Sequence, residues 1–264
     1  MAADPLDDFD RSEVTYDGTT RPVFRKGTGP GVIVISEVPG ITPDVADFAR
    51  RVEALGCTVV MPSLFGEPGR EMSGGYAAGV IARVCVSREF ATWATGRTSP
   101  VTGWLRQLAR DLHQEVGGPG VGVVGMCLTG GFGLAMTVEP AVIAPVLSQP
   151  SLPFPVTGKH RADLGLSADD LDRVKQRVAD DDVCVLGLRF TGDRYVPAER
   201  FATLRRELGD NFVGIEIDSS EGNPHGIPTQ AHSVLTEHLV DEPGHPTRDA
   251  LDEVLALFRD RLLA

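Results

Sequence analysis

The sequence contains three residues whose side chains could together carry out nucleophilic catalysis. In chain order they are Cys127, Asp193 and His232. An ordinary cysteine has a pKa of about 8.5, so only about 3% of it is thiolate at pH 7 and it needs a base to attack a carbonyl. A histidine can take the thiol proton, and a carboxylate can fix the tautomer of that histidine. The three side chains together predict hydrolysis through a covalent bond to sulfur.

The sequence around Cys127 has the form of a sharp turn between a strand and a helix. An apolar β-branched run ends at Val124, and a glycine-rich, apolar stretch with helical potential follows the cysteine. A nucleophile on such a turn is a nucleophile elbow, in which small residues relieve the close approach of strand and helix. The pattern here is Gly-x-Cys-x-Thr, so Thr129 stands where the usual motif has a second glycine. We expect Gly130 and Gly131 to supply the missing clearance.

Other interpretations of this stretch remain open at this point. A free cysteine is often only a small buried apolar residue. The glycines at 120, 122 and 125 spell G-x-G-x-x-G, but a nucleotide loop should follow its strand, whereas these glycines lie before and within it. A redox function would need a second cysteine within disulfide reach of Cys127.

The acid and the base each have an alternative as well. Asp193 follows a buried strand, where it could instead form a turn or cap the helix that begins near Pro197. His232 is favoured as the base, with His225 in a turn-like Asn-Pro-His-Gly segment as its rival. The chain order of nucleophile, acid and histidine is the order found in α/β-hydrolases.

Glu37 follows the first strongly apolar strand, residues 31–36. A carboxylate there is costly to bury unless it is paired or protonated, although it could also be a solvated loop residue. We expect it beside the thiol of Cys127. The backbone N–H groups of Val38 and Leu128 would then form the oxyanion hole, one from the loop after this strand and one from the residue after the nucleophile.

Strands and helices alternate along most of the sequence, which predicts a mostly parallel sheet covered by helices on both faces. Residues 13–264 are expected to form one α/β domain, preceded by a flexible tail over residues 1–12. A hairpin is predicted at Asp17-Gly18. Further strands are expected at 57–61, 121–124, 141–147, 183–190 and 212–217. Helices are expected at 43–55, 80–93, 100–116, 132–138, 167–178, 197–209 and 247–262. Ligands of such sheets bind at the carboxyl ends of the strands, where the candidate residues lie.

Composition narrows the function further. The 264 residues are 42% hydrophobic and carry a net charge of -12, which argues against nucleic acid or an anionic membrane as a partner. No apolar run is long enough to span a membrane, and the acidic start lacks a signal core, so a cytoplasmic location is expected. The four cysteines are widely separated and form no CxxC pair, which argues against zinc and against disulfides.

The sequence resembles the dienelactone hydrolase family over residues 20 to 262. The segments that carry the resemblance are Ile35-Ser-Glu-Val-Pro-Gly40, Gly125-Met-Cys-Leu-Thr-Gly-Gly131, Thr191-Gly-Asp193 and Ala231-His-Ser233. It implies an α/β-hydrolase fold, a small ester or lactone substrate, and no metal or organic cofactor.

The resemblance also implies a function for individual residues. Cys127 would be the nucleophile, His232 its base, Asp193 the residue that orients the base, and Glu37 the partner of the resting thiol. Arg88 would bind a substrate carboxylate, unless it is a plain surface arginine. Because Thr129 departs from the family pattern, a ligand-binding protein without turnover on the same scaffold is the alternative function.

Overall fold

The computed structural model describes residues 3–264, and these residues contain one eight-stranded sheet in the order β1-β2-β4-β3-β5-β6-β7-β8. The first two strands and β4 pair antiparallel, and every pairing from β4 through β3 to β8 is parallel. The strand bounds are β1 Asp10–Tyr16, β2 Thr19–Lys26, β3 Gly31–Ile35, β4 Thr58–Pro62, β5 Val121–Met126, β6 Val142–Ser148, β7 Val185–Phe190 and β8 Phe212–Ile217.

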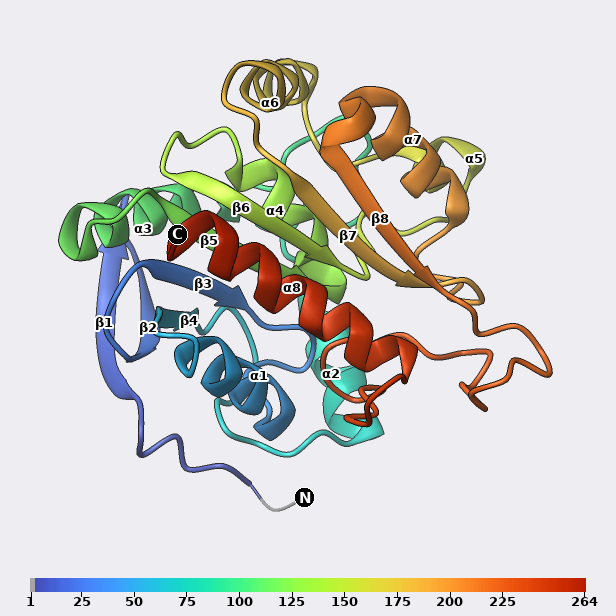
Figure 1. Ribbon diagram of the computed structural model, residues 1–264, viewed down its shortest axis with the longest axis horizontal. Helices are drawn as coiled ribbons and strands as arrows, with labels where there is room; N and C mark the ends of the chain where they lie inside the picture. The colour runs from blue at the N-terminus through green and yellow to red at the C-terminus, as the bar shows by residue number, and fades with distance from the viewer. Residues whose placement is uncertain (1–2) are drawn as a thin grey trace.

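Helices cover both faces of this sheet (Figure 1). Their bounds are α1 Pro43–Glu53, α2 Gly74–Val86, α3 Val101–Val116, α4 Gly130–Met136, α5 Gly158–Ala162, α6 Ala168–Asp180, α7 Ala198–Leu208 and α8 Pro246–Leu262, with short 3-10 turns at Cys127–Thr129 and Gly209–Asn211. The predicted α/β class and mostly parallel sheet are confirmed.

The central strands bury side chains on both faces, as expected for a sheet between two helical layers. Successive residues of β3 alternate between two apolar clusters: Val32 and Val34 pack with α1 and α8, whereas Ile33 and Ile35 pack with α3. A third cluster joins α4, α6 and α7 near β7. These layers hold the carboxyl ends of β3, β5, β6 and β7 at one edge of the sheet.

Two local predictions can be compared with the structure. The hairpin at Asp17-Gly18 is confirmed, because Tyr16 pairs with Thr19 across it and Asp17 has a φ of 48°. The helix predicted at 80–93 instead spans Gly74–Val86. Two consecutive glycines at its start suggested a loop, since glycine is a poor helix former.

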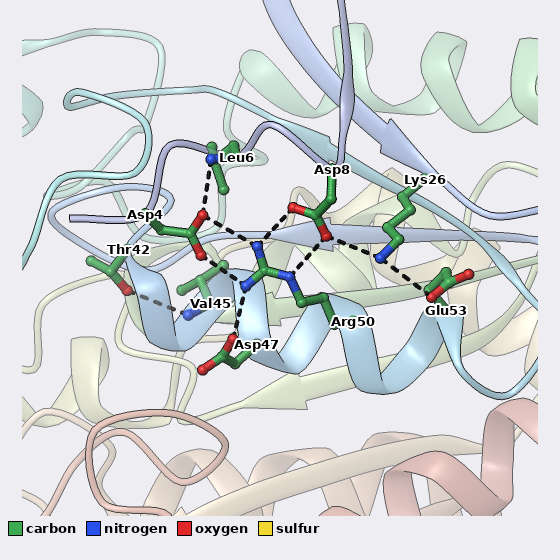
Figure 2. A network of polar contacts seen from close by, with 9 residues as sticks. All are labelled: Asp4, Leu6, Asp8, Lys26, Thr42, Val45, Asp47, Arg50 and Glu53. Carbon is green, nitrogen blue, oxygen red and sulfur yellow. Dashed lines mark hydrogen bonds and ion pairs between the residues drawn. The ribbon is translucent and has the colours of Figure 1, made fainter. Parts of the chain in front are cut away.

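Residues 4–9 pack against the domain, in contrast to the flexible tail expected over residues 1–12; residues 1 and 2 lie outside the described part. Leu6 and Phe9 are buried. Figure 2 shows the guanidinium of Arg50 on α1 held between Asp4 and Asp8, with an N–O distance of 2.8 Å to each. The hydrogen bonds from Arg50 lower the pKa of both carboxyl groups.

Within residues 3–264, no helix has both the length and the apolar character needed to cross a membrane.

Candidate active site

Cys127 occupies the turn between β5 and α4. Its φ is 56°, a left-handed conformation that a residue with a Cβ rarely adopts and that costs of order 1–3 kcal/mol. The surrounding fold must supply that energy, and such outliers gather at active sites. Its carbonyl accepts a hydrogen bond from the backbone N–H of Ser151 at 2.9 Å, and the Ser151 hydroxyl lies 3.8 Å from the sulfur. The sulfur is therefore presented at the carboxyl edge of the sheet in a fixed position.

Thr129 replaces a glycine of the usual motif with a side chain that bonds to the turn itself. Its buried hydroxyl accepts a hydrogen bond from the N–H of Met126 at 2.9 Å and lies 3.0 Å from the carbonyl of Ile35 at the end of β3. The clearance comes from other positions. A Cβ on Gly125 would lie 2.1 Å from the carbonyl of Thr129, and one on Gly130 would lie 2.5 Å from Pro150, whereas Gly131 has no such close neighbour.

Asp193 and His232 lie together although 39 residues separate them. Nδ1 of His232 is 2.6 Å from Oδ2 of Asp193, which leaves Nε2 as the ring nitrogen for another partner. The other carboxylate oxygen of Asp193 accepts from the N–H of Tyr195 at 2.8 Å. Gly192 lets the two loops meet, since a Cβ there would lie 2.4 Å from the carbonyl of Thr229. The long segment between β8 and α8, which carries His232, is visible in Figure 1.

The charge state of His232 depends on its two neighbours. Burial alone would lower its pKa, but the Cys127 sulfur and the hydrogen bond to Asp193 outweigh burial and raise the pKa well above the usual value. Cys127 and His232 both line one cavity at this edge of the sheet. An imidazolium beside a sulfur favours the thiolate, which is the nucleophilic form. The structure thus brings Cys127, His232 and Asp193 to the same edge of the sheet.

The rival histidine lies elsewhere. His225 is exposed on the loop after β8, where its ring faces that of His245 with centroids 5.3 Å apart. It does not line the cavity that contains Cys127. Of the two predicted candidates, only His232 lines the cavity together with Cys127.

Glu37 is buried, and its carboxyl group bonds to side chains from two other segments. Ser233 lies 2.6 Å from Oε2, Thr236 bonds to Oε1, and the amide of Gln149 donates to Oε2 at 3.2 Å. Gln149, at the end of β6, also accepts from the N–H of Val234 at 3.3 Å. Glu37 thereby connects β3 to the loop that carries the histidine. Within residues 3–264, its hydrogen bonds reach these side chains and not the sulfur.

Burial raises the pKa of Glu37 above its usual value, and the hydrogen bonds from Ser233 and Thr236 only partly offset this. The stability that the protonated group contributes is complete below an unfolded-state pKa of about 4.3 and is lost as the pH rises through the folded-state pKa. We therefore expect Glu37→Gln to gain stability relative to the unmodified protein as the pH rises from 5 to 8. Urea unfolding at several pH values measures this, and the difference can widen by at most about 1.4 kcal/mol per pH unit.

The exposed loop residue Glu221 offers a control, because Glu221→Gln makes the same chemical change at a side chain that lies in solvent. A constant difference for Glu37→Gln over the same range would contradict the prediction.

Two backbone N–H groups predicted for the oxyanion hole belong to residues that line the cavity, Val38 and Leu128. Leu128 directly follows Cys127 in the first turn of the short 3-10 helix Cys127–Thr129, where N–H groups lack an acceptor within the helix. In the described residues, no backbone carbonyl accepts from the N–H of Val38.

Comparison with known proteins tests the resemblance. A model of the dienelactone hydrolase family matches residues 20–261 of the chain. The chain belongs to the dienelactone hydrolase family. As a member of this family, the protein is a hydrolase that acts on ester bonds. A search of curated proteins found no match.

Solved structures share the fold of this family member at low sequence identity. A dienelactone hydrolase-like promiscuous phosphotriesterase from metagenomic libraries is 17% identical with a TM-score of 0.61, over 96% of this chain and 98% of that one. A cold-adapted esterase from an Arctic intertidal metagenomic library is 15% identical with a TM-score of 0.58, over 96% and 92%. A thioesterase domain from the curacin biosynthetic pathway is 12% identical with a TM-score of 0.54, over 94% and 99%.

The dienelactone hydrolase homologue has a cavity of about 590 Å³ beside the sulfur. The structure does not bring Arg88 to it: that side chain is exposed on the turn after α2 and does not line the cavity. The arginine that does line it is Arg194, directly after Asp193, which the sequence analysis did not single out. Tyr195 was missed as well; its ring packs edge-on against that of His232, with centroids 5.7 Å apart. Proximity in sequence to Asp193 was the signal that could have identified both.

One wall of the cavity is the segment 150–163, which follows β6. It is held by Arg200 of α7, a nearly fully buried residue whose guanidinium donates to four backbone carbonyls of this segment, those of Pro150, Pro153, His160 and Asp163. Burial lowers the pKa of Arg200 to about 10, so it remains a cation at neutral pH. The wall is thus fixed through its main chain.

Proposed function

We propose that this chain hydrolyses small carboxylic esters or lactones through a thioester on Cys127. The observation that carries the proposal is the 2.6 Å contact between Nδ1 of His232 and Oδ2 of Asp193, in the wall of the cavity that Cys127 also lines. Family membership supports ester hydrolysis, and the site supports the choice of nucleophile.

In the first half of the reaction, His232 holds the proton taken from Cys127 and the thiolate attacks the substrate carbonyl. The new C–S bond turns the carbonyl oxygen into an oxyanion, for which the N–H groups of Val38 and Leu128 are the donors in this proposal. When the oxyanion collapses, the C–O bond breaks and the leaving alcohol takes the proton from His232. A thioester and a neutral imidazole remain.

In the second half, the neutral imidazole of His232 removes a proton from water, and the resulting hydroxide attacks the thioester carbonyl. The C–S bond breaks, the carboxylic acid leaves, and the sulfur and imidazole return to their starting state. Asp193 holds Nδ1 throughout, so that Nε2 faces the reacting atoms. Glu37 enters the proposal as a positioning residue for the histidine loop, since its carboxyl group is bonded to Ser233 and Thr236.

The experiment that tests this function is to trap the acyl-enzyme. After mixing with p-nitrophenyl acetate and quenching in acid, we expect one acetyl group on the peptide that contains Cys127, by mass spectrometry, together with a burst of nitrophenol equal to the enzyme concentration. Steady turnover with the acetyl group on another residue would contradict the assignment. A sulfur that neither this ester nor iodoacetamide modifies would favour the non-catalytic ligand-binding alternative.

A further inference from the structure

The side chains that line the cavity beside Cys127 are mostly apolar. The α2 side contributes Met72, Ala77, Ile81 and Cys85, and the opposite wall contributes Phe154, Pro155 and Val156, with Trp93 and Tyr195 at the rim. The rings of Trp93 and Phe154 pack with centroids 5.0 Å apart. A cavity of about 590 Å³ lined in this way suits a small organic ligand with little polarity.

Several of these apolar side chains are left open to solvent at the cavity rim. Ile81 is 40% exposed, Trp93 53% and Tyr195 57%. Large apolar groups gathered around a cavity commonly mark a binding surface, because water contact with them is unfavourable. Here they extend the apolar wall outward from the reacting sulfur, which gives a chain or ring attached to the ester a surface to cover.

The charged groups of the lining do not favour an anion. The lining has one arginine, Arg194, and one acid outside the buried network, Glu237. Burial raises the pKa of the other carboxyl group there, that of Glu37, and the imidazolium of His232 is already paired with Asp193. Arg194 is exposed and already donates to the Oε1 atom of Gln230 at 3.1 Å. An ion pair with so exposed a guanidinium contributes only about 0–1 kcal/mol. Transfer of a substrate carboxylate from water to this apolar lining would cost more than that.

We propose that the substrate is an uncharged ester carrying an extended apolar group, in place of the carboxylate-bearing lactone that gave the family its name. The proposal rests on the hydrolytic function proposed above. It assigns Ile81, Trp93 and Phe154 to binding of the apolar group.

Matched substrates that differ only at the chain end test this inference. One pair places the chain in the acyl half: p-nitrophenyl hexanoate and the mono-p-nitrophenyl ester of adipic acid. A second pair places it in the alcohol half: hexyl acetate and the acetyl ester of 6-hydroxyhexanoate, followed by pH-stat. We expect kcat/KM to favour the uncharged member by at least about tenfold in one pair or both. A smaller preference in both pairs overturns the inference.

Two variants locate the apolar group. Ile81→Ala and Trp93→Ala remove partly exposed side chains, and each should lower kcat/KM by at least about threefold for the preferred six-carbon substrate. The same variants should lower kcat/KM for p-nitrophenyl acetate by a smaller factor, because its acyl chain covers less of the apolar wall. Val86→Ala is the matched control, since Val86 lies on the same helix, is 83% exposed and does not line the cavity. Equal effects on long and short substrates, or none, overturn the assignment.

The failure of this inference can be told from failure of the function. If p-nitrophenyl acetate acylates Cys127 but the charged substrates are turned over as well as the neutral ones, the function stands and the substrate class is wrong. If no ester acylates Cys127, both are overturned.

Discussion

Cys127→Ala is expected to lower kcat for ester hydrolysis by at least about 10⁴-fold, because losing the nucleophile of a catalytic triad removes the covalent route entirely. The fold should survive, since the side chain is small and only partly buried, and the urea midpoint should stay close to that of the unmodified protein. Steady-state kinetics with p-nitrophenyl acetate, together with urea unfolding, measure the two effects.

Two further variants make this result specific to the sulfur. Cys127→Ser should also be much slower than the unmodified protein, because a serine hydroxyl needs a stronger base than an imidazole poised for a thiol. Cys184→Ala is the control, as Cys184 lies just before the amino end of β7 and does not line the cavity, so its activity should be unchanged. Activity in Cys127→Ala near that of the control would rule out the proposed nucleophile.

Asp193→Asn is expected to lower kcat by about 10⁴-fold, by analogy with the loss seen when the acid of a Ser-His-Asp triad becomes an amide. The amide cannot hold Nδ1 as a donor in the same way, and it removes one of the interactions that raise the pKa of His232. The imidazolium should therefore persist over a narrower pH range. Kinetics give the loss in kcat.

A second measurement separates this effect from simple misfolding. The rate of alkylation of Cys127 by iodoacetamide at pH 6, divided by the rate at pH 9, should fall in Asp193→Asn, because less imidazolium remains beside the sulfur at the lower pH. Asp218→Asn is a suitable control: its carboxyl oxygen accepts from the N–H of Ser220 at 2.9 Å, which an amide oxygen can also do. An unchanged alkylation ratio would argue against Asp193 as the partner of His232.

The order of strands and helices could be predicted from the sequence because each central strand is a short apolar run buried on both faces. The sequence pattern did not predict the start of α2, because the glycines there belong to a helix and not to a loop. At Gly74 and Gly75 two glycines begin α2, and neither has a close neighbour that would explain its lack of a side chain. Residues 4–9 looked like a polar tail because several of them are acidic. Their partner, Arg50, lies 42 to 46 positions away in the sequence, so the pairing becomes visible only in the folded chain.

The candidate site was predictable to the extent that it depends on strand ends. Cys127 directly follows β5 and Asp193 lies three positions after the end of β7, so topology alone brings them to one edge of the sheet. His232 lies 15 residues beyond the end of β8, in a segment without regular structure, and only the folded chain separates it from His225. The partners of Glu37 were not predictable, because Gln149 and Ser233 reach it through side-chain contacts that leave no periodic trace in the sequence.

The guanidinium of Arg200 has a consequence for how selectivity in this molecule can change. It donates hydrogen bonds to backbone carbonyls of the 150–163 segment, none of which belongs to positions 154 to 156. The backbone of this cavity wall is therefore held without help from the side chains at those three positions. The side chains at those positions can vary in size and polarity while the hydrogen bonds from Arg200 to the backbone stay the same. Altered preference for one ester over another can therefore arise by exchange of a few side chains that line the cavity, with Cys127 and His232 left undisturbed.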